Sequence, residues 1–194
     1  PDEPQLYPIK FSYGQDEVES YFGLRKFSKI QKDGKHYFAI NNKPIFLNGL
    51  LDQGYFPNGF YTPESNKVLY EQVLDVKNLG YNMLRKHIKV ESDLWYYYCD
   101  ILGVVVWQDM MNGGAKYSQF RINVMPFIRY QLNDGNYRSM RRGDERSREQ
   151  YLLEANRLID RLFNCVSLQL YTPFNEGWGQ FDAVKNYQIL SQKD

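Results

Sequence analysis

The sequence predicts an α/β fold in which parallel strands alternate with helices. Segments with helical spacing separate four short apolar strands, predicted at residues 45–48, 81–85, 104–107 and 166–171. Strand–helix units of this length imply parallel strands joined by right-handed crossovers. Four such units would form half of an eight-stranded β/α barrel, but a doubly wound open sheet gives the same local pattern. The sequence has no Gly-rich phosphate loop that would favour a nucleotide-binding protein.

The first 40 residues have a β pattern instead. Val18–Arg25 alternates loosely and predicts one strand of a preceding β domain whose other strands are absent. Residues 27–40 predict a hairpin, because Asp33-Gly34 supplies the two positive-φ positions of a type I′ turn.

Helices are predicted by apolar spacing and by their end signals. The first contains Leu69, Val73, Val76 and Leu79 and ends at Gly80. The second begins at Ser92 or Asp93, contains Leu94, Tyr98, Ile101 and Leu102, and ends at Gly103. A third contains Leu152, Ala155, Ile159 and Leu162, and a fourth lies within residues 181–190. The segment from about 108 to 144 is irregular, and we interpret the nearby arginines as a solvated loop and helix start: Arg138, Arg141, Arg142, Arg146 and Arg148.

Composition excludes several classes of function. The chain has 194 residues, 43% of them hydrophobic, which is enough for a buried core, and a net charge of +1. That charge gives no indication of nucleic acid or an anionic membrane as a partner, and no apolar run approaches the length of a membrane span. The start at Pro1 suggests a processed or excised piece. Cys99 and Cys165 are predicted to be buried free thiols, which indicate no particular compartment.

Polar and aromatic side chains follow the predicted strands at their carboxyl ends, where β/α barrels hold their catalytic residues. After the first strand come Asn48, Asp52, Gln53 and Tyr55, and after the second Arg85, His87, Lys89 and Glu91. After the third come Trp107, Gln108 and Asp109, and after the fourth Asn175, Glu176, Trp178 and Gln180. This set suits the recognition of hydroxyl groups together with stacking on aromatic rings.

Several of these residues also have a structural interpretation. His87 and Glu91 could be a metal pair, but they leave a strand and have no third ligand spaced nearby, so we predict neither metal nor cofactor. Arg85 is either a ligand clamp or an ion-pair partner of Glu91 or Asp109. Trp107 is interpreted as core, Asp100 as solvated, His36 as a surface residue, and Lys86 and Lys89 as solvated or paired with acids.

Glu176 is the strongest catalytic candidate. It follows an apolar strand, has Asn175 immediately before it, and is flanked in sequence by Phe174 and Trp178. An apolar surround favours the protonated form of a carboxyl group, which a general acid requires. The structural alternative is a capping or salt-bridged glutamate at a strand-to-helix turn.

Four ordered segments resemble glycoside hydrolase family 2, the β-galactosidase, β-glucuronidase and β-mannosidase group. They are Phe46–Gly49 (FLNG), Gly80–His87 (GYNMLRKH), Asp100–Trp107 (DILGVVVW) and Phe174–Trp178 (FNEGW). The resemblance implies that residues 27–194 are the first half of a TIM-type (β/α)8 barrel. It also implies that residues 1–26 are the end of an immunoglobulin-like β-sandwich domain.

The resemblance also implies a retaining, exo-acting β-glycosidase that cleaves a carbohydrate substrate. The activity that we expect from it is β-galactosidase-like. Glu176 would be the general acid/base. The substrate-binding residues would be Asn175, Arg85, His87, Asp52, Asp109 and Trp178. The loops Leu50–Tyr55 and Gln108–Met111 depart from the family pattern, which leaves the sugar open.

The nucleophile of the family ends the seventh strand, beyond Asp194, so we expect this chain to be inactive by itself. We also expect it to self-associate, because half a barrel exposes strand edges. The alternative is a non-catalytic carbohydrate-binding module with Tyr55, Trp107 and Trp178 as a stacking platform.

Overall fold

The computed structural model describes residues 2–120, 124–125, 127–128, 132–176 and 179–193. The chain divides into two compact units. The first consists of Pro1–Gln108 with Asn164–Leu170, and the second of Asp109–Phe163 with Tyr171–Asp194.

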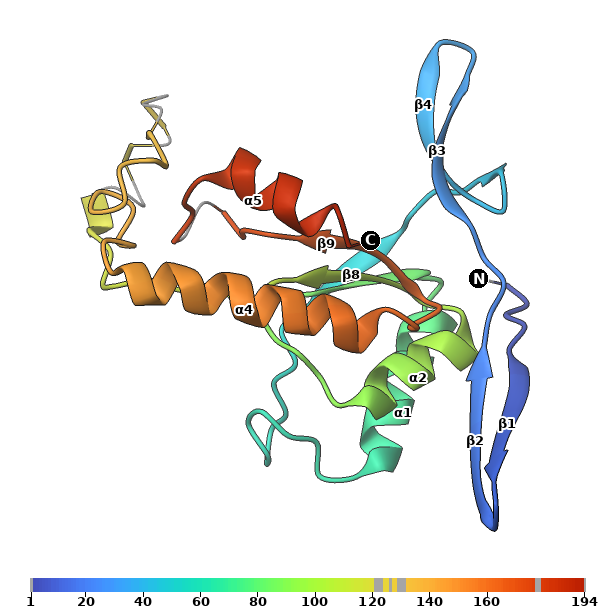
Figure 1. The fold of residues 1–194 in the computed structure, drawn as a ribbon. Coiled ribbons are helices and arrows are strands. Elements are labelled where there is room, and N and C mark those ends of the chain that lie inside the picture. The colour runs from blue at the N-terminus through green and yellow to red at the C-terminus, as the bar shows by residue number, and fades with distance from the viewer. Residues whose placement is uncertain (1, 121–123, 126, 129–131, 177–178, 194) are drawn as a thin grey trace. The chain divides into compact units, whose positions relative to one another are not determined.

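The chain begins with a two-stranded hairpin of β1 (Tyr7–Tyr13) and β2 (Asp16–Phe22), seen in Figure 1. The expectation of a single strand over 18–25 without a partner was therefore wrong. Gly14, at φ 61°, makes a tight turn that lets the preceding seven residues pair with the following strand.

A second antiparallel sheet contains β3 (Phe27–Lys32), β4 (Lys35–Ile40) and the short β5 (Lys43–Pro44). The predicted 27–40 hairpin is confirmed. Asp33 and Gly34 have φ values of 50° and 72°, as a type I′ turn requires. His36 is exposed on β4, as predicted.

A four-stranded sheet follows in the order β6 (Gly49–Asp52), β7 (Met83–Lys86), β8 (Val105–Asp109) and β9 (Leu168–Thr172). The pairs β6–β7 and β7–β8 are parallel, as predicted. The first strand was expected at 45–48 but begins at Gly49. The Asn82 side chain binds the backbone of Phe46 and Asn48 at 2.8 and 2.9 Å, so side-chain bonds join the single backbone bond from the Asn82 amide to the Asn48 carbonyl there.

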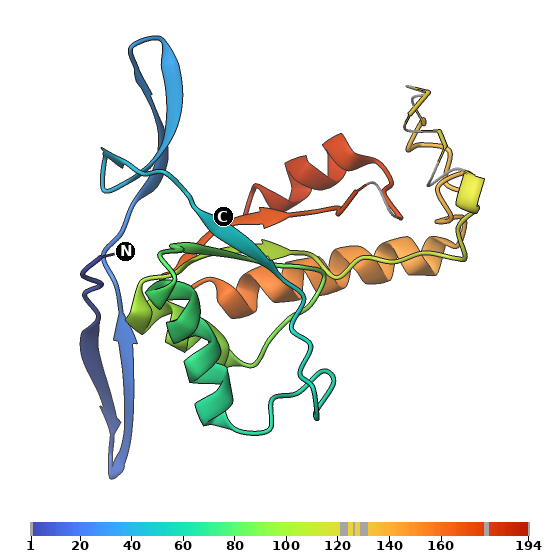
Figure 2. The same ribbon diagram turned by 180° about the vertical axis from the view of Figure 1, so that it is seen from behind.

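Two helices of the first unit, α1 (Asn66–Asn78) and α2 (Asp93–Leu102), lie side by side on one face of the sheet (Figure 2). Their predicted ends are confirmed: Gly80 has φ 86°, and Gly103 ends α2 at φ 68°. The buried residues of α2 are Trp95, Tyr96, Cys99 and Asp100, and none of them is among the four residues by which the sequence indicated the helix. The polar groups of Tyr96 and Asp100 are buried because they have hydrogen-bond partners.

The second unit contains α4 (Glu145–Leu162) and α5 (Ala183–Leu190). Asp144 caps α4 by accepting the Arg146 amide at 3.2 Å. Among the described residues, no helix is long and apolar enough to cross a bilayer.

Candidate functional site

The predicted site residues are divided between the two units. Asp52, Arg85 and His87 belong to the first, whereas Asp109, Asn175 and Glu176 belong to the second. Trp178 lies outside the described residues.

In the first unit, Asp52 ends β6 and is held from two sides. Its Oδ2 atom lies 2.6 Å from Lys86 Nζ, and its Oδ1 atom accepts the Gly54 amide at 2.7 Å. The register of the parallel pair sets Asp52 directly beside Lys86. The Asp52 carboxylate thus neutralises a buried ammonium group and fixes the start of the following loop.

Lys86 and Lys89 share a second carboxylate, that of Glu91. The Glu91 Oε1 atom lies 3.0 Å from Lys86 Nζ and 2.7 Å from Lys89 Nζ. Lys86 also stands over the Trp95 ring, with its Nζ atom 4.3 Å from the ring centroid. Both lysines are buried, so the solvated alternative was wrong and the pairing with acids is confirmed. The ammonium groups of Lys86 and Lys89 are thus paired with the carboxylates of Asp52 and Glu91, and buried charges need such pairing to be stable.

Lys89 holds the loop of residues 53–62, which we call the β6 loop. Its Nζ atom donates to the carbonyl oxygens of Gly54 at 2.5 Å and Tyr61 at 2.8 Å, one near each end of the loop. The loop presents Tyr55 and Tyr61 edge to face, with centroids 5.1 Å apart and both side chains more than half exposed. Sequence reasoning missed this anchor, although a lysine between apolar residues shortly after a strand was a usable signal.

Arg85 and His87 alternate with the buried Lys86 along the end of β7. Both are partly exposed, while Leu84 and Lys86 are buried on the opposite face of the strand. The His87 Nδ1 atom lies 3.4 Å from Gln53 Nε2, and its backbone amide donates to Asp52 at 2.9 Å. Since Glu91 is bound to the two lysines, the geometry does not support pairing it with His87 around a metal.

Trp107 is half-buried on β8. Its indole nitrogen donates to Gln169 Oε1 at 2.8 Å, and its ring meets Phe38 edge-on at 5.8 Å. Trp107 thus packs against neighbouring side chains, but it is not among the buried residues of the core.

In the second unit, Asn175 and Glu176 lie in a turn that begins shortly after β9, beyond Pro173 and Phe174. Asn175 is buried, with 5% of its surface exposed, whereas Glu176 is exposed and has φ 51°. A left-handed glutamate is strained by about 1–2 kcal/mol, so the surrounding chain has to enforce this turn.

The Phe174 ring was expected to help enclose the Glu176 carboxylate, but it packs against other rings. Its ring stacks on Tyr151 at 5.0 Å and meets Phe181 at 5.6 Å, within an aromatic cluster of the second unit. Glu176 is exposed, and Trp178, the other flanking ring, lies outside the described residues, so the apolar surround of Glu176 stays a prediction.

The turn is anchored on both sides of the two candidate residues. The Tyr151 hydroxyl donates to the Pro173 carbonyl at 2.6 Å. On the other side, the Asp134 carboxylate accepts from the Gln180 side chain at 3.0 Å and from the Ala183 amide at 2.8 Å. These residues could not be assigned from sequence, because each lies more than 20 positions from its partner.

Asp109 ends β8 and is fully buried. The next residue, Met110, donates its amide to the Thr172 carbonyl at 2.9 Å, which joins the ends of β8 and β9 within the second unit. Asp109 and the Asn175–Glu176 turn therefore follow two strand ends that are bonded to each other.

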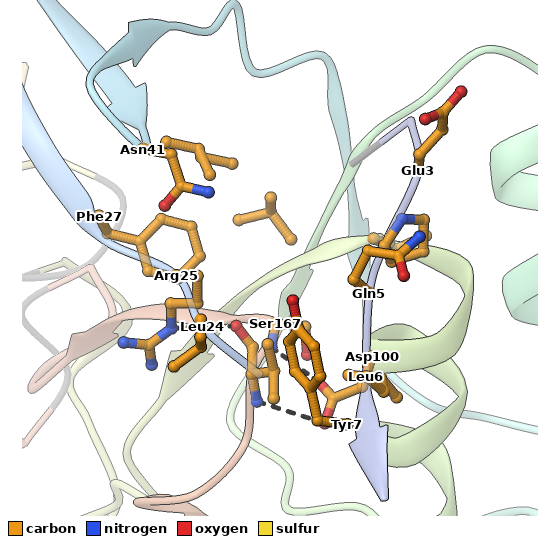
Figure 3. Close-up of a pocket in the computed structure, with 16 residues that line it drawn as sticks. Glu3, Gln5, Leu6, Tyr7, Leu24, Arg25, Phe27, Asn41, Asp100 and Ser167 are labelled. Carbon is orange, nitrogen blue, oxygen red and sulfur yellow. Dashed lines mark hydrogen bonds between the residues drawn. The ribbon is translucent and has the colours of Figure 1, made fainter. Parts of the chain in front are cut away.

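A cavity of about 290 Å³ opens at the other end of the sheet, beside the residues that precede β8 and β9 (Figure 3). Asp100 borders it but is buried, so the solvated interpretation was wrong. Its carboxylate accepts from the Tyr21 hydroxyl at 2.8 Å and the Ser167 amide at 2.7 Å. Burial and, to a smaller extent, the Asp100 charge raise the pKa of Tyr21. The predicted site residues do not line this cavity, and parallel sheets carry their chemistry at the carboxyl ends.

The two cysteines are buried free thiols, as predicted. Burial, assisted by the Asp100 charge, raises the pKa of Cys165 to about 12. A thiol with such a pKa remains protonated and unreactive near neutral pH.

Comparisons of sequence relate the chain to β-mannosidases. Over 130 residues it is 29% identical to "Beta-mannosidase B" of Aspergillus terreus, a match that covers 59% of this chain and 15% of that protein. It is 31% identical over 128 residues to "Probable beta-mannosidase" of Caenorhabditis elegans, covering 59% and 14%. The chain thus spans about a seventh of the length of these relatives. No protein-family model matches it.

Comparisons of structure give the same fold in larger proteins. A GH2 β-galacturonidase from Eisenbergiella tayi bound to galacturonate matches 98% of this chain and 30% of its own, with a TM-score of 0.73 at 17% identity. A Parabacteroides merdae β-glucuronidase with glycerol in its active site matches 100% and 22%, with a TM-score of 0.69 at 18% identity. Both likenesses show a shared fold.

Proposed function

We propose that this chain, a member of glycoside hydrolase family 2, carries the general acid/base of a retaining β-glycosidase. The observation that carries the proposal is the Asn175–Glu176 turn at the carboxyl end of β9, the fourth strand of the four-stranded sheet. In this proposal, residues 27–194 form the first half of a (β/α)8 barrel, and residues 1–26 end an immunoglobulin-like domain.

The chemistry of Glu176 has two steps. Its protonated carboxyl gives a proton to the oxygen of the leaving group while a nucleophilic carboxylate attacks the anomeric carbon. The resulting Glu176 carboxylate then takes a proton from the water that releases the sugar from the enzyme. Exposure of Glu176 supports this role, because the carboxyl must reach both an incoming glycoside and water.

We assign the nucleophile to a residue outside this chain. Retention needs a second carboxylate about 5–5.5 Å from the acid/base. Asp52 is bound to Lys86 and the Gly54 amide, which makes it a poor candidate. By this proposal the 194-residue chain alone hydrolyses no glycoside.

The substrate-binding residues proposed here are Asn175, Arg85, His87 and Asp109, with Trp178 as a stacking residue. Arg85 and His87 present donors from the face of β7 opposite Lys86. In this proposal Asp52 does not bind the sugar, the role that the sequence suggested for it. It instead holds Lys86 and the start of the β6 loop in place.

The test uses the full-length protein that contains this sequence. Glu176→Gln is expected to lower kcat/KM about 100-fold or more on glycosides with poor leaving groups, because general acid catalysis contributes that much. Activated aryl glycosides, which need little protonation, should keep most of their rate. Glu149→Gln, an exposed glutamate on α4, is the control. An equal loss of kcat/KM on glycosides with poor and with activated leaving groups would contradict the acid/base assignment.

The sugar is a separate part of the proposal. The relatives matched in sequence are named β-mannosidases, whereas the resemblance of the four segments implied a β-galactosidase-like enzyme and the loops after the first and third strands left the sugar open. Aryl β-mannoside, β-galactoside and β-glucuronide should be compared with the wild-type protein, and we expect β-mannoside to be hydrolysed fastest.

A further inference from the structure

One buried arginine joins the loops that follow β8 and β9. The Arg142 guanidinium donates to the Asn112 side chain at 2.6 Å and to the Gly179 carbonyl at 2.9 Å. Asn112 lies three residues after Asp109, and Gly179 lies three residues after Glu176. The predicted role of Arg142 as a solvated loop residue was therefore wrong.

The surroundings of Arg142 hold it in one orientation. Its Nη1 atom donates to the Ser147 hydroxyl at 2.8 Å, and its guanidinium carbon lies 5.6 Å from the ring centroids of both Tyr151 and Phe181. Only 6% of the residue is exposed. The guanidinium thus donates to three partners at once, Asn112, Ser147 and Gly179. A lysine ammonium group lacks the planar set of donors that this requires.

Gly179 allows the loop after β9 to approach Arg142 and the loop after β8 closely. A Cβ atom there would lie 2.5 Å from the Gly113 carbonyl oxygen and 3.0 Å from Arg142 Nε, and φ is 62°. The backbones of the two loops therefore approach as closely as glycine allows. Any shift of Arg142 would therefore press on Gly179, which lies three residues after Glu176.

We propose that Arg142 is a positioning residue that fixes the Glu176 turn against the loop after Asp109. The proposal rests on the proposed acid/base role of Glu176. Arg142 does not react itself. Its hydrogen bond to the Gly179 carbonyl fixes the chain three residues after Glu176, and in this proposal that anchor lets the carboxyl meet the glycosidic oxygen at the distance needed for proton transfer.

The experiment compares leaving groups in the full-length protein. Arg142→Ala and Arg142→Lys are expected to lower kcat/KM about 10- to 100-fold on a phenyl glycoside, the loss that a misplaced catalytic group causes. On a 2,4-dinitrophenyl glycoside, whose departure needs little protonation, the loss should be less than about threefold by the same reasoning. Arg146→Ala is the control, because this neighbouring arginine is exposed at the start of α4.

A double mutant separates positioning from general stability. In the Glu176→Gln background, Arg142→Lys should have little further effect on the phenyl glycoside, since residues that act through one another are not additive. Equal losses on the two substrates, or additive losses in the double mutant, would overturn the proposal. If the arginine variants do not fold, Asn112→Ala removes one partner of the same guanidinium and should show the same dependence on leaving group.

Failure of this proposal differs from failure of the proposed function. If Glu176→Gln depends on the leaving group and the Arg142 and Asn112 variants do not, only the positioning role is lost. If Glu176→Gln itself shows no such dependence, the acid/base assignment falls and the positioning proposal falls with it.

Discussion

Lys86 is a fully buried ammonium group whose carboxylate partners come from the end of β6 and from the segment before α2. Lys86→Met should lower the free energy of unfolding by about 3–5 kcal/mol, because Asp52 and Glu91 lose a shared buried partner. Lys67→Met should change it by less than about 1 kcal/mol, because the Lys67–Glu71 pair is exposed. Urea unfolding of this chain followed by circular dichroism measures both, and similar small changes for the two variants would contradict the importance of the network.

Single residues were the hardest to interpret from the sequence. The periodic pattern located Glu176 and Asn175 at the end of a strand, because that depends only on neighbouring residues. It gave the wrong environment for Asp100 and Arg142, whose partners lie 67 positions away at Ser167 and 37 positions away at Gly179. A charged side chain looks solvated in sequence until the backbone groups that bind it are known.

At the scale of elements, α5 begins without a cap from its own N-cap residue. Asp182 makes no such bond, and Asp134 accepts the Ala183 amide instead. The Ala183 amide and then the Gln180 side chain lower the pKa of Asp134. Because the pKa is lower in the folded state than in the unfolded state, the stabilisation is present above the unfolded value. It is lost as pH falls through the folded value.

This cap gives a prediction for α5. Asp134→Asn should lower the hydrogen-exchange protection factors of Ala183 and the first turn of α5 near neutral pH. Protection factors correct for the slowing of intrinsic exchange by acid, and in the wild-type chain they should fall as pH drops through the lowered pKa of folded Asp134. Asp16→Asn in the first hairpin is the control. The assignment would be contradicted if exchange in this turn did not respond to the substitution.

Elements were predicted well where the pattern is local. The helices containing Leu69 and Ala155 and the 27–40 hairpin follow from spacing and turn residues alone. The strand expected at 45–48 moved to Gly49 because the Asn82 side chain, 34 positions from Asn48, binds the backbone there. The pairing of β1 with β2 was missed because the partner strand lies in a segment interpreted as a tail.

At the scale of the molecule, the first unit exposes the outer strand of its parallel sheet. β6 pairs with β7 alone in the described sheet, and Phe46 and Leu51 near it are 84% and 55% exposed. We expect this chain to self-associate at micromolar concentration, because open strand edges beside apolar side chains recruit other strands. Sedimentation velocity should show species larger than the 23.1 kDa monomer. Leu51→Lys should reduce them, and a wild-type monomer at all concentrations would contradict the prediction.

The anchor of the β6 loop has a consequence for how this protein can change. Lys89 binds that loop through two backbone carbonyl oxygens, a group that every residue type possesses. The Lys89 Nζ atom also lies 5.2 Å and 5.1 Å from the ring centroids of Phe56 and Tyr61, and a Cβ atom added at Gly54, whose φ is 67°, would lie 2.7 Å from Lys89. Mutation can therefore alter the exposed Tyr55 while the two backbone bonds to Lys89 persist. The loop offers a place where an exposed aromatic side chain can change without refolding the sheet that supports it.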